Sequence, residues 1–151
     1  METGQKRFPI GVQTFDKIIE GNYLYIDKTG YVDEVAGKYQ YVFLSRPRRF
    51  GKSLLSSTFH CYFEGRKELF EGLKAGEKKT EWKKHPVFHF DMSTAKHMNE
   101  EQLLRCLDYK LAEYERIYGK NQSIDDTDVN ARLELLIKAA FGQTGEQAVL
   151  I

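Results

Sequence analysis

The chain has 151 residues, the length of one ordinary domain, and its 23 Lys and Arg residues against 22 Asp and Glu residues leave a net charge of +1. This balance excludes a globally basic nucleic-acid-binding protein and an acidic tail protein. Hydrophobic residues make up 41%, so there is enough apolar material for a packed core. The sequence contains no apolar run long enough for a membrane span or a signal peptide, and we therefore expect a cytoplasmic protein.

The amino-terminal segment predicts two short helices. Thr14 can cap the first helix, which ends at Gly21, and the second is expected at about 29–36. A short extended run at 23–26 separates them. We expect these elements to form a small amino-terminal helical segment that precedes the main sheet in the sequence.

The strongest strand signal in the chain lies at 39–44. This segment is aromatic and β-branched, and its continuous apolar end predicts burial on both faces of a sheet. A loop at 45–50 follows. Gly51 then opens a helix that carries apolar residues every fourth position and that can end at Gly65.

The second half of the chain predicts further strands and helices in alternation. The segment 64–84 is charged and mixed in sign, and we expect a solvated connection that is anchored by its apolar residues Leu69, Phe70, Leu73 and Trp82. After it we expect a strand at 86–91, a helix at 99–119, a helix at 129–140 with Gly142 after it, and a strand at 147–151. This alternation predicts an α/β sandwich with a largely parallel sheet, which binds its ligands at the carboxyl ends of the strands.

The loop after the 39–44 strand resembles a phosphate-binding loop, G-x-x-x-x-G-K-[ST]. Gly51, Lys52 and Ser53 match the last three fixed positions, whereas Arg46 stands where the pattern has Gly. Gly51 allows backbone N–H groups to approach a phosphate. Lys52 would place its ammonium on the β- and γ-phosphates, and Ser53 would offer a hydroxyl to Mg²⁺. The loop therefore predicts binding of a nucleoside triphosphate.

Positive charge gathers on this loop in an otherwise neutral chain. Arg46, Arg48, Arg49 and Lys52 place four cations within eight residues. A chance G-K-[ST] triplet occurs in about one in thirteen chains of this length, so it is the placement between a strand and a helix that strengthens the signal. The alternative is a basic surface turn whose cations are simply solvated.

Residues 45–53 read S-R-P-R-R-F-G-K-S and resemble the Walker A loop of the bacterial predicted AAA-ATPase-like family. Arg46, which departs from the general phosphate-binding pattern, is therefore the form that this family itself carries. Segments 9–12 with 25–29, 62–73 and 82–91 resemble further blocks of the same family. The resemblance implies an incomplete three-layer α/β sandwich, P-loop NTPase-like and of the AAA type with an additional strand. It implies ATP and Mg²⁺ as cofactors, with Lys52 as the catalytic residue and Ser53 as the metal ligand. The implied nucleotide-binding residues are Arg46, Pro47, Arg48, Arg49, Phe50, Gly51, Lys52, Ser53 and Leu54.

The same resemblance implies parts that these residues do not contain. In the family, an apolar Walker B strand runs directly into Asp-Glu, whereas the apolar residues 148–151 are the last ones here. The sensor strand, which lies between the Walker A and Walker B strands, is also absent. We therefore expect residues 1–151 to be the amino-terminal part of one AAA-ATPase-like domain, truncated at the Walker B strand, with little or no hydrolysis. Many full-length members carry a nuclease-like domain of the PD-(D/E)xK type.

Other acidic residues are weaker candidates for the site. Asp91 ends the second strand and could face the site, although turn or helix capping is the simpler role. Asp27 and Lys28 could border the nucleotide or form a surface ion pair. Asp125, Asp126 and Asp128 lack the Gly and Glu of a calcium loop, which favours helix capping.

The cysteines and histidines were also considered as functional residues, and the sequence suggests possible binding partners. Cys61 and Cys106 are expected to be buried reduced thiols, and the four histidines show no ligand spacing. The partners expected are a nucleotide and either a second copy or another chain that completes the sheet. The alternative function is a phosphate- or nucleic-acid-binding module, or an inert fragment.

Overall fold

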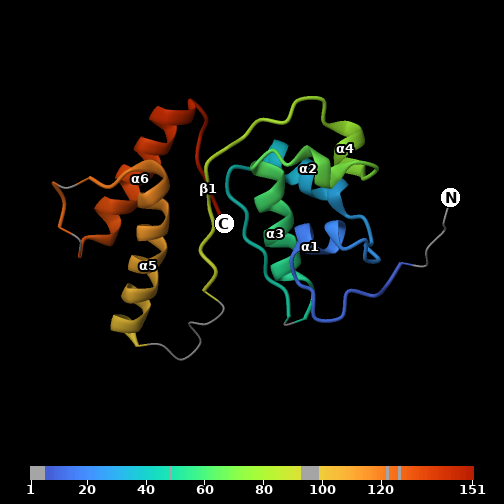
Figure 1. Cartoon of the computed structure of the whole chain (residues 1–151), viewed down its shortest axis with the longest axis horizontal. Helices are drawn as coiled ribbons and strands as arrows, with labels where there is room; N and C mark the ends of the chain where they lie inside the picture. Colours follow the sequence, from blue (N-terminus) through green and yellow to red (C-terminus); the bar gives the residue numbers. More distant parts are fainter. Residues whose placement is uncertain (1–5, 48, 93–98, 122, 126) are drawn as a thin grey trace. The chain divides into compact units, whose positions relative to one another are not determined.

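A computed structural model describes residues 6–47, 49–92, 99–121, 123–125 and 127–151 (Figure 1). The chain divides into two compact units, Met1–Lys84 and His85–Ile151. Both units are mostly helical. The named strands, β1 (Val87–Phe88) and β2 (Val149–Leu150), belong to the second unit. No helix in the described part of the chain has the length and apolar character that crossing a membrane requires.

In the first unit, α1 and α2 pack against the longer α3, and α4 packs against α2 and η1. Thr14 occupies the N-cap position of α1 as predicted, although its side chain makes no capping hydrogen bond, and Gly21 ends the helix. α2 runs slightly further than expected. The connection at 64–84 contributes to the core through its predicted apolar anchors, because Leu69 and Phe70 are buried and Leu73 and Trp82 pack against the core. The elements are α1 (Phe15–Glu20), α2 (Thr29–Lys38), α3 (Lys52–Phe63), the 3-10 helix η1 (Lys67–Phe70) and α4 (Lys74–Lys78).

Aromatic rings form the core of this unit. The Phe70 ring lies 4.8 Å from the Phe15 ring and 4.9 Å from the Trp82 ring, measured between centroids. Tyr62 of α3 meets Trp82 edge-on at 5.5 Å, and the Lys79 ammonium lies 3.7 Å from the centre of the Tyr62 ring. Aromatic pairs of this kind add about 0.5–1.5 kcal/mol each beyond the burial of their surface. The core therefore joins α1, α3 and the 64–84 connection.

The strand predicted at 39–44 is not formed, which corrects the strongest strand assignment from the sequence. Residues 41–44 are irregular, and no hydrogen bond from a described residue reaches their backbone. Tyr41 and Phe43 are 86% and 93% exposed. A strand in a parallel sheet depends on neighbouring strands for its hydrogen bonds and burial. No described strand supplies them, so the apolar segment remains in solvent.

The second unit pairs two long helices with the two short strands. Asn99 caps α5 (Glu100–Tyr118) through a full capping box with Gln102, and Gly119 ends the helix as predicted. α6 (Val129–Thr144) continues past Gly142 and ends at Gly145, which adopts the left-handed conformation at φ 72°. The expected end at Gly142 is therefore wrong by about one helical turn.

β1 and β2 pair in parallel, with Val87 opposite Val149 and Phe88 opposite Leu150. Parallel pairing is confirmed for these two strands, although the described residues do not form a three-layer sandwich. The core of this unit contains the buried residues Phe88, Leu111, Leu136 and Ala140. Its packing holds α5, α6 and β1 together.

Candidate phosphate-binding loop

The loop that precedes α3 is a sharp turn built from two residues with positive φ. Arg49 has φ 68° and Gly51, the N-cap of α3, has φ 74°. Gly adopts this conformation at no steric cost, whereas a residue with a Cβ pays roughly 1–2 kcal/mol. Arg46, Pro47, Arg49, Phe50 and Gly51 are all exposed, and Arg48 lies outside the described residues. The turn thus places the start of α3 in solvent.

The first turn of α3 presents backbone N–H groups. Leu55 donates its N–H to the Gly51 carbonyl at 2.9 Å, which is the first backbone hydrogen bond of the helix. The N–H groups of Lys52, Ser53 and Leu54 receive no cap from the described residues, and Gly51 has no side chain to supply one. Free N–H groups and the positive end of the helix dipole together favour an anion at this position.

The Lys52 ammonium folds back over the loop. Its Nζ donates to the backbone carbonyl of Arg46 at 2.7 Å, so the first residue of α3 is joined to the start of the loop. Lys52 and Ser53 are exposed, and Leu54 is half-buried. The Ser53 hydroxyl suits Mg²⁺, because that ion keeps several waters and binds mainly to phosphate and few protein oxygens. The loop residues therefore fit a magnesium-bound phosphate group.

Ser57 fixes α3 to the amino-terminal segment. The Phe15 N–H donates to Ser57 Oγ at 2.9 Å in a buried position, and Ser57 Oγ donates to the Leu54 carbonyl at 2.9 Å. The Tyr62 hydroxyl donates to Asp33 Oδ1 at 2.7 Å, which ties α3 to α2. Sequence reasoning missed Ser57, because a serine within a helix carries no signal for a contact 42 positions away.

Asp27 caps two helices and forms no surface ion pair with Lys28, which corrects that expectation. Its Oδ1 accepts from the N–H and the hydroxyl of Thr29, at 2.8 Å and 2.7 Å. Its Oδ2 accepts from the Lys74 N–H at 2.8 Å, and the Thr29 hydroxyl accepts from the Ala75 N–H. The carboxylate therefore joins the first turns of α2 and α4.

Replacing Asp27 with Ala is expected to lower the free energy of unfolding by about 1–2 kcal/mol at pH 7, since each lost cap costs on the order of 1 kcal/mol. Burial acts to raise the pKa of Asp27, but hydrogen bonds from Thr29 and Lys74 outweigh it and hold the pKa below the ordinary 3.8. The stabilisation is therefore present above pH 3.8 and is lost as the pH falls through the lower folded-state pKa.

Urea denaturation from pH 7 to pH 2 measures this effect. The difference in stability between the parent and Asp27→Ala should shrink as the solution is acidified below about pH 4. Glu71→Ala, which removes an exposed carboxylate, serves as the matched control. A difference that stays constant down to pH 2 would contradict the capping role.

The other acidic candidates have local roles. Asp128 caps α6 by accepting from the Ala131 N–H at 3.0 Å, and Asp125 accepts from the Thr127 N–H and hydroxyl. This confirms the capping assignment for Asp128 and gives Asp125 a turn-forming role, while Asp126 lies outside the described residues. Asp91 is exposed beyond β1. Among the residues the structure describes, no group of three or more His, Cys, Asp or Glu side chains could hold a metal ion.

The two cysteines differ in their surroundings. Cys61 is buried in the first core, and burial raises the pKa of its thiol to about 11. It is therefore protonated and unreactive at neutral pH. Cys106 is only half-buried, so the expectation of two buried thiols holds for one of them.

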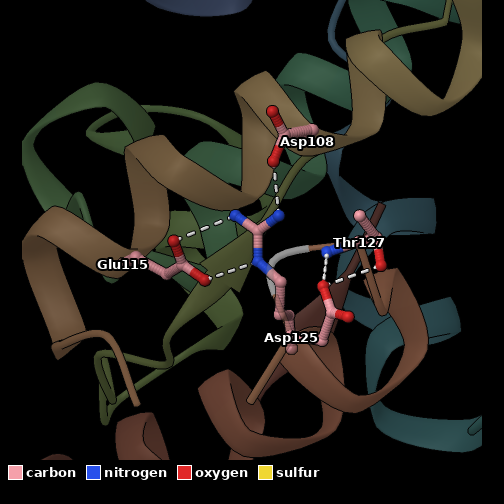
Figure 2. Close-up of polar contacts among 5 residues, drawn as sticks. Asp108, Glu115, Asp125 and Thr127 are labelled. Carbon is pink, nitrogen blue, oxygen red and sulfur yellow. Dashed lines mark hydrogen bonds and ion pairs between the residues drawn. The ribbon is translucent and has the colours of Figure 1, made fainter. Parts of the chain in front are cut away.

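Arg132 forms a buried ion-pair cluster that sequence reasoning missed. Its Nε and Nη2 donate to the two carboxylate oxygens of Glu115 at 2.8 Å and 3.0 Å, and its Nη1 donates to Asp108. Figure 2 shows Glu115 and Asp108 on the same helix, with the Asp125–Thr127 turn beside them. These hydrogen bonds raise the pKa of Arg132. Because both carboxylates engage the guanidinium, we assign the cluster to joining α5 and α6.

Comparison with known proteins finds a family that matches this chain. The family model described as "Predicted AAA-ATPase" matches residues 9–151. An "Uncharacterized protein in vnfD 5'region" from Azotobacter chroococcum mcd 1 is 36% identical over 150 residues, which cover 97% of this chain. The chain spans 28% of the length of that relative. No solved structure matches the chain.

Proposed function

Because the chain belongs to the predicted AAA-ATPase family, we propose that the loop before α3 binds the phosphates of Mg²⁺-ATP. The observation that carries the proposal is the Lys52 ammonium, which lies over a turn that leads into a helix of 12 residues with uncapped N–H groups. In this proposal the phosphates replace the Arg46 carbonyl as the partner of Lys52. Backbone N–H groups of α3 take the remaining phosphate oxygens.

Ser53 supplies the protein ligand to Mg²⁺ in this proposal. Its exposed hydroxyl belongs to the first turn of α3, next to Lys52 in sequence. Arg46 and Arg49 add positive charge at the exposed loop and attract the triphosphate. Hydrolysis also needs an acid that holds the metal and a group that orients water. We propose that in the longer family members these groups follow the strand that corresponds to β2.

Replacing Lys52 with Ala is expected to weaken Mg²⁺-ATP binding. A hydrogen bond to a charged partner contributes roughly 1.5–3 kcal/mol, which corresponds to about a tenfold to 150-fold increase in Kd. Isothermal titration calorimetry on the 151-residue chain measures the change. Thermal unfolding gives a second reading, because ATP should raise the Tm of the parent far more than that of the variant.

Lys67→Ala is the matched control, because Lys67 is an exposed lysine of η1 in the same unit. It should bind Mg²⁺-ATP as the parent does. Equal ATP affinity in the parent and in Lys52→Ala would contradict the proposal. Binding of single-stranded DNA that falls steeply with salt and ignores ATP would instead support a nucleic-acid-binding module.

A further inference from the structure

The amino-terminal helix α1 receives its cap from another helix. Thr14 occupies the N-cap position, but its side chain makes no capping hydrogen bond. The N–H of Phe15, the first residue of α1, donates instead to Ser57 Oγ of α3 at 2.9 Å. Phe15 is fully buried, and a buried N–H without a partner is costly because water cannot replace the lost hydrogen bond. The Ser57 hydroxyl therefore does for α1 what an N-cap side chain does in an ordinary helix.

The same hydroxyl is bonded to the first turn of α3. Ser57 Oγ donates its single proton to the Leu54 carbonyl at 2.9 Å, so it accepts from α1 while it donates within α3. The buried Thr58 hydroxyl donates to the same carbonyl at 2.7 Å. One buried side chain thus joins the start of α1 to the turn whose N–H groups face the candidate phosphate site.

The two joined segments depend on each other for stability. α1 has only 6 residues, and a helix of this length is not stable by itself in water. The start of α3 has N–H groups without a cap, and helix ends of this kind open locally. An anion on these N–H groups would keep the turn formed. Because the Leu54 carbonyl holds the Ser57 hydroxyl, a formed turn also keeps the cap of α1 in place.

We propose that Ser57 is a positioning residue that couples the docking of α1 to nucleotide binding at the loop before α3. This coupling rests on the proposed binding of Mg²⁺-ATP. Bound Mg²⁺-ATP then protects the Phe15 N–H, and loss of the Ser57 hydroxyl weakens Mg²⁺-ATP binding, because linkage between two sites is reciprocal. Ser57 bonds the Phe15 N–H and the Leu54 carbonyl, so it acts through the first turn of α3 and not on the nucleotide itself.

Hydrogen exchange at the Phe15 amide tests the coupling in the unmodified chain. Nuclear magnetic resonance measures the exchange rate of each amide with and without saturating Mg²⁺-ATP. The Lys79 amide, which donates to the Ala75 carbonyl at the end of α4, reports the general stabilisation of the same unit. Mg²⁺-ATP should slow exchange at Phe15 about fivefold or more beyond the change at Lys79, the lower end of ordinary coupling between sites.

Replacement of Ser57 tests the reverse direction. Ser57→Ala removes the hydroxyl and leaves the Phe15 N–H without its Ser57 partner. Isothermal titration calorimetry, at a temperature where circular dichroism shows the variant to be folded, should give a Kd for Mg²⁺-ATP about fivefold or more above that of the parent. Ser57→Thr keeps a hydroxyl and should restore most of the affinity. Ser56→Ala is the matched control, because the Ser56 hydroxyl donates to the Lys52 carbonyl within α3 and its loss leaves the bond to α1 intact.

The outcomes separate the coupling from the proposed function. A parent chain that does not bind Mg²⁺-ATP contradicts the proposed function and overturns the coupling with it. A parent that binds Mg²⁺-ATP, but whose Phe15 amide is slowed no more than the Lys79 amide, overturns the coupling alone. This result stands even if Ser57→Ala does not fold. Equal affinity in the parent and in folded Ser57→Ala would likewise leave Ser57 with a purely structural role.

Discussion

Replacing Arg132 with Ala is expected to lower the free energy of unfolding of the second unit by about 3–5 kcal/mol. The substitution leaves Glu115, whose side chain is only 7% exposed, as a buried carboxylate without its partner. Removing one member of a buried ion pair costs this much because the remaining charge has lost both water and its counter-ion. Because marginal domains have total stabilities of about 5–15 kcal/mol, the unit should be close to unfolding at 37 °C.

Two further variants distinguish the contribution of the buried Arg132–Glu115 pair to stability from that of the exposed Asp108. Asp108 also accepts from Arg132, but its side chain is 58% exposed, so Asp108→Asn should cost less than about 1 kcal/mol. The double variant Arg132→Met with Glu115→Leu removes both charges and should recover most of the stability. Urea denaturation followed by far-ultraviolet circular dichroism measures all three. A small loss in Arg132→Ala that equals the loss in Asp108→Asn would contradict the stabilising role of the buried Arg132–Glu115 pair.

The helices could be predicted from the sequence because their signals are local. Asn99 and Gly119 bracket α5 within a few residues of its ends, and Thr14 and Gly21 do the same for α1. The segment at 39–44 has the composition of a buried strand, yet its conformation depends on distant backbone that must lie beside it. Composition alone could not reveal that no described strand pairs with it.

In the candidate site, too, the features that are local in the sequence could be predicted, and the contacts between distant residues could not. Gly51, Lys52 and Ser53 could be proposed as candidates because the pattern of a phosphate-binding loop is contiguous in the sequence. The contact from Lys52 to the Arg46 carbonyl and the tie from Phe15 to Ser57 needed coordinates, since they depend on how the chain folds back. The same holds for Asp27, which could be noticed as a charged residue but not as a cap for α4, 47 positions away.

Truncating Phe70 to Ala is expected to cost the first unit about 3–5 kcal/mol, because the side chain is fully buried and a cavity replaces it. Phe70 contacts Phe15 of α1, Tyr62 of α3 and Trp82 of the connection. These contacts hold the elements that carry the candidate phosphate-binding loop. Under the proposed function, the variant should therefore also lose the stabilisation expected from Mg²⁺-ATP at temperatures where the unit is unfolded.

Trp82 is the single tryptophan of the chain and lies against Phe70, so its fluorescence reports the unfolding of this unit. Phe8→Ala is the matched control, because the Phe8 side chain is exposed and its loss should change the stability by less than about 0.5 kcal/mol. The urea midpoint of Trp82 fluorescence should fall sharply in Phe70→Ala and stay near that of the parent in Phe8→Ala.

Since Arg132 belongs to the other unit, Arg132→Ala should leave this midpoint nearly unchanged if the units unfold separately. A shared shift in both variants would instead show that the units unfold as one cooperative body.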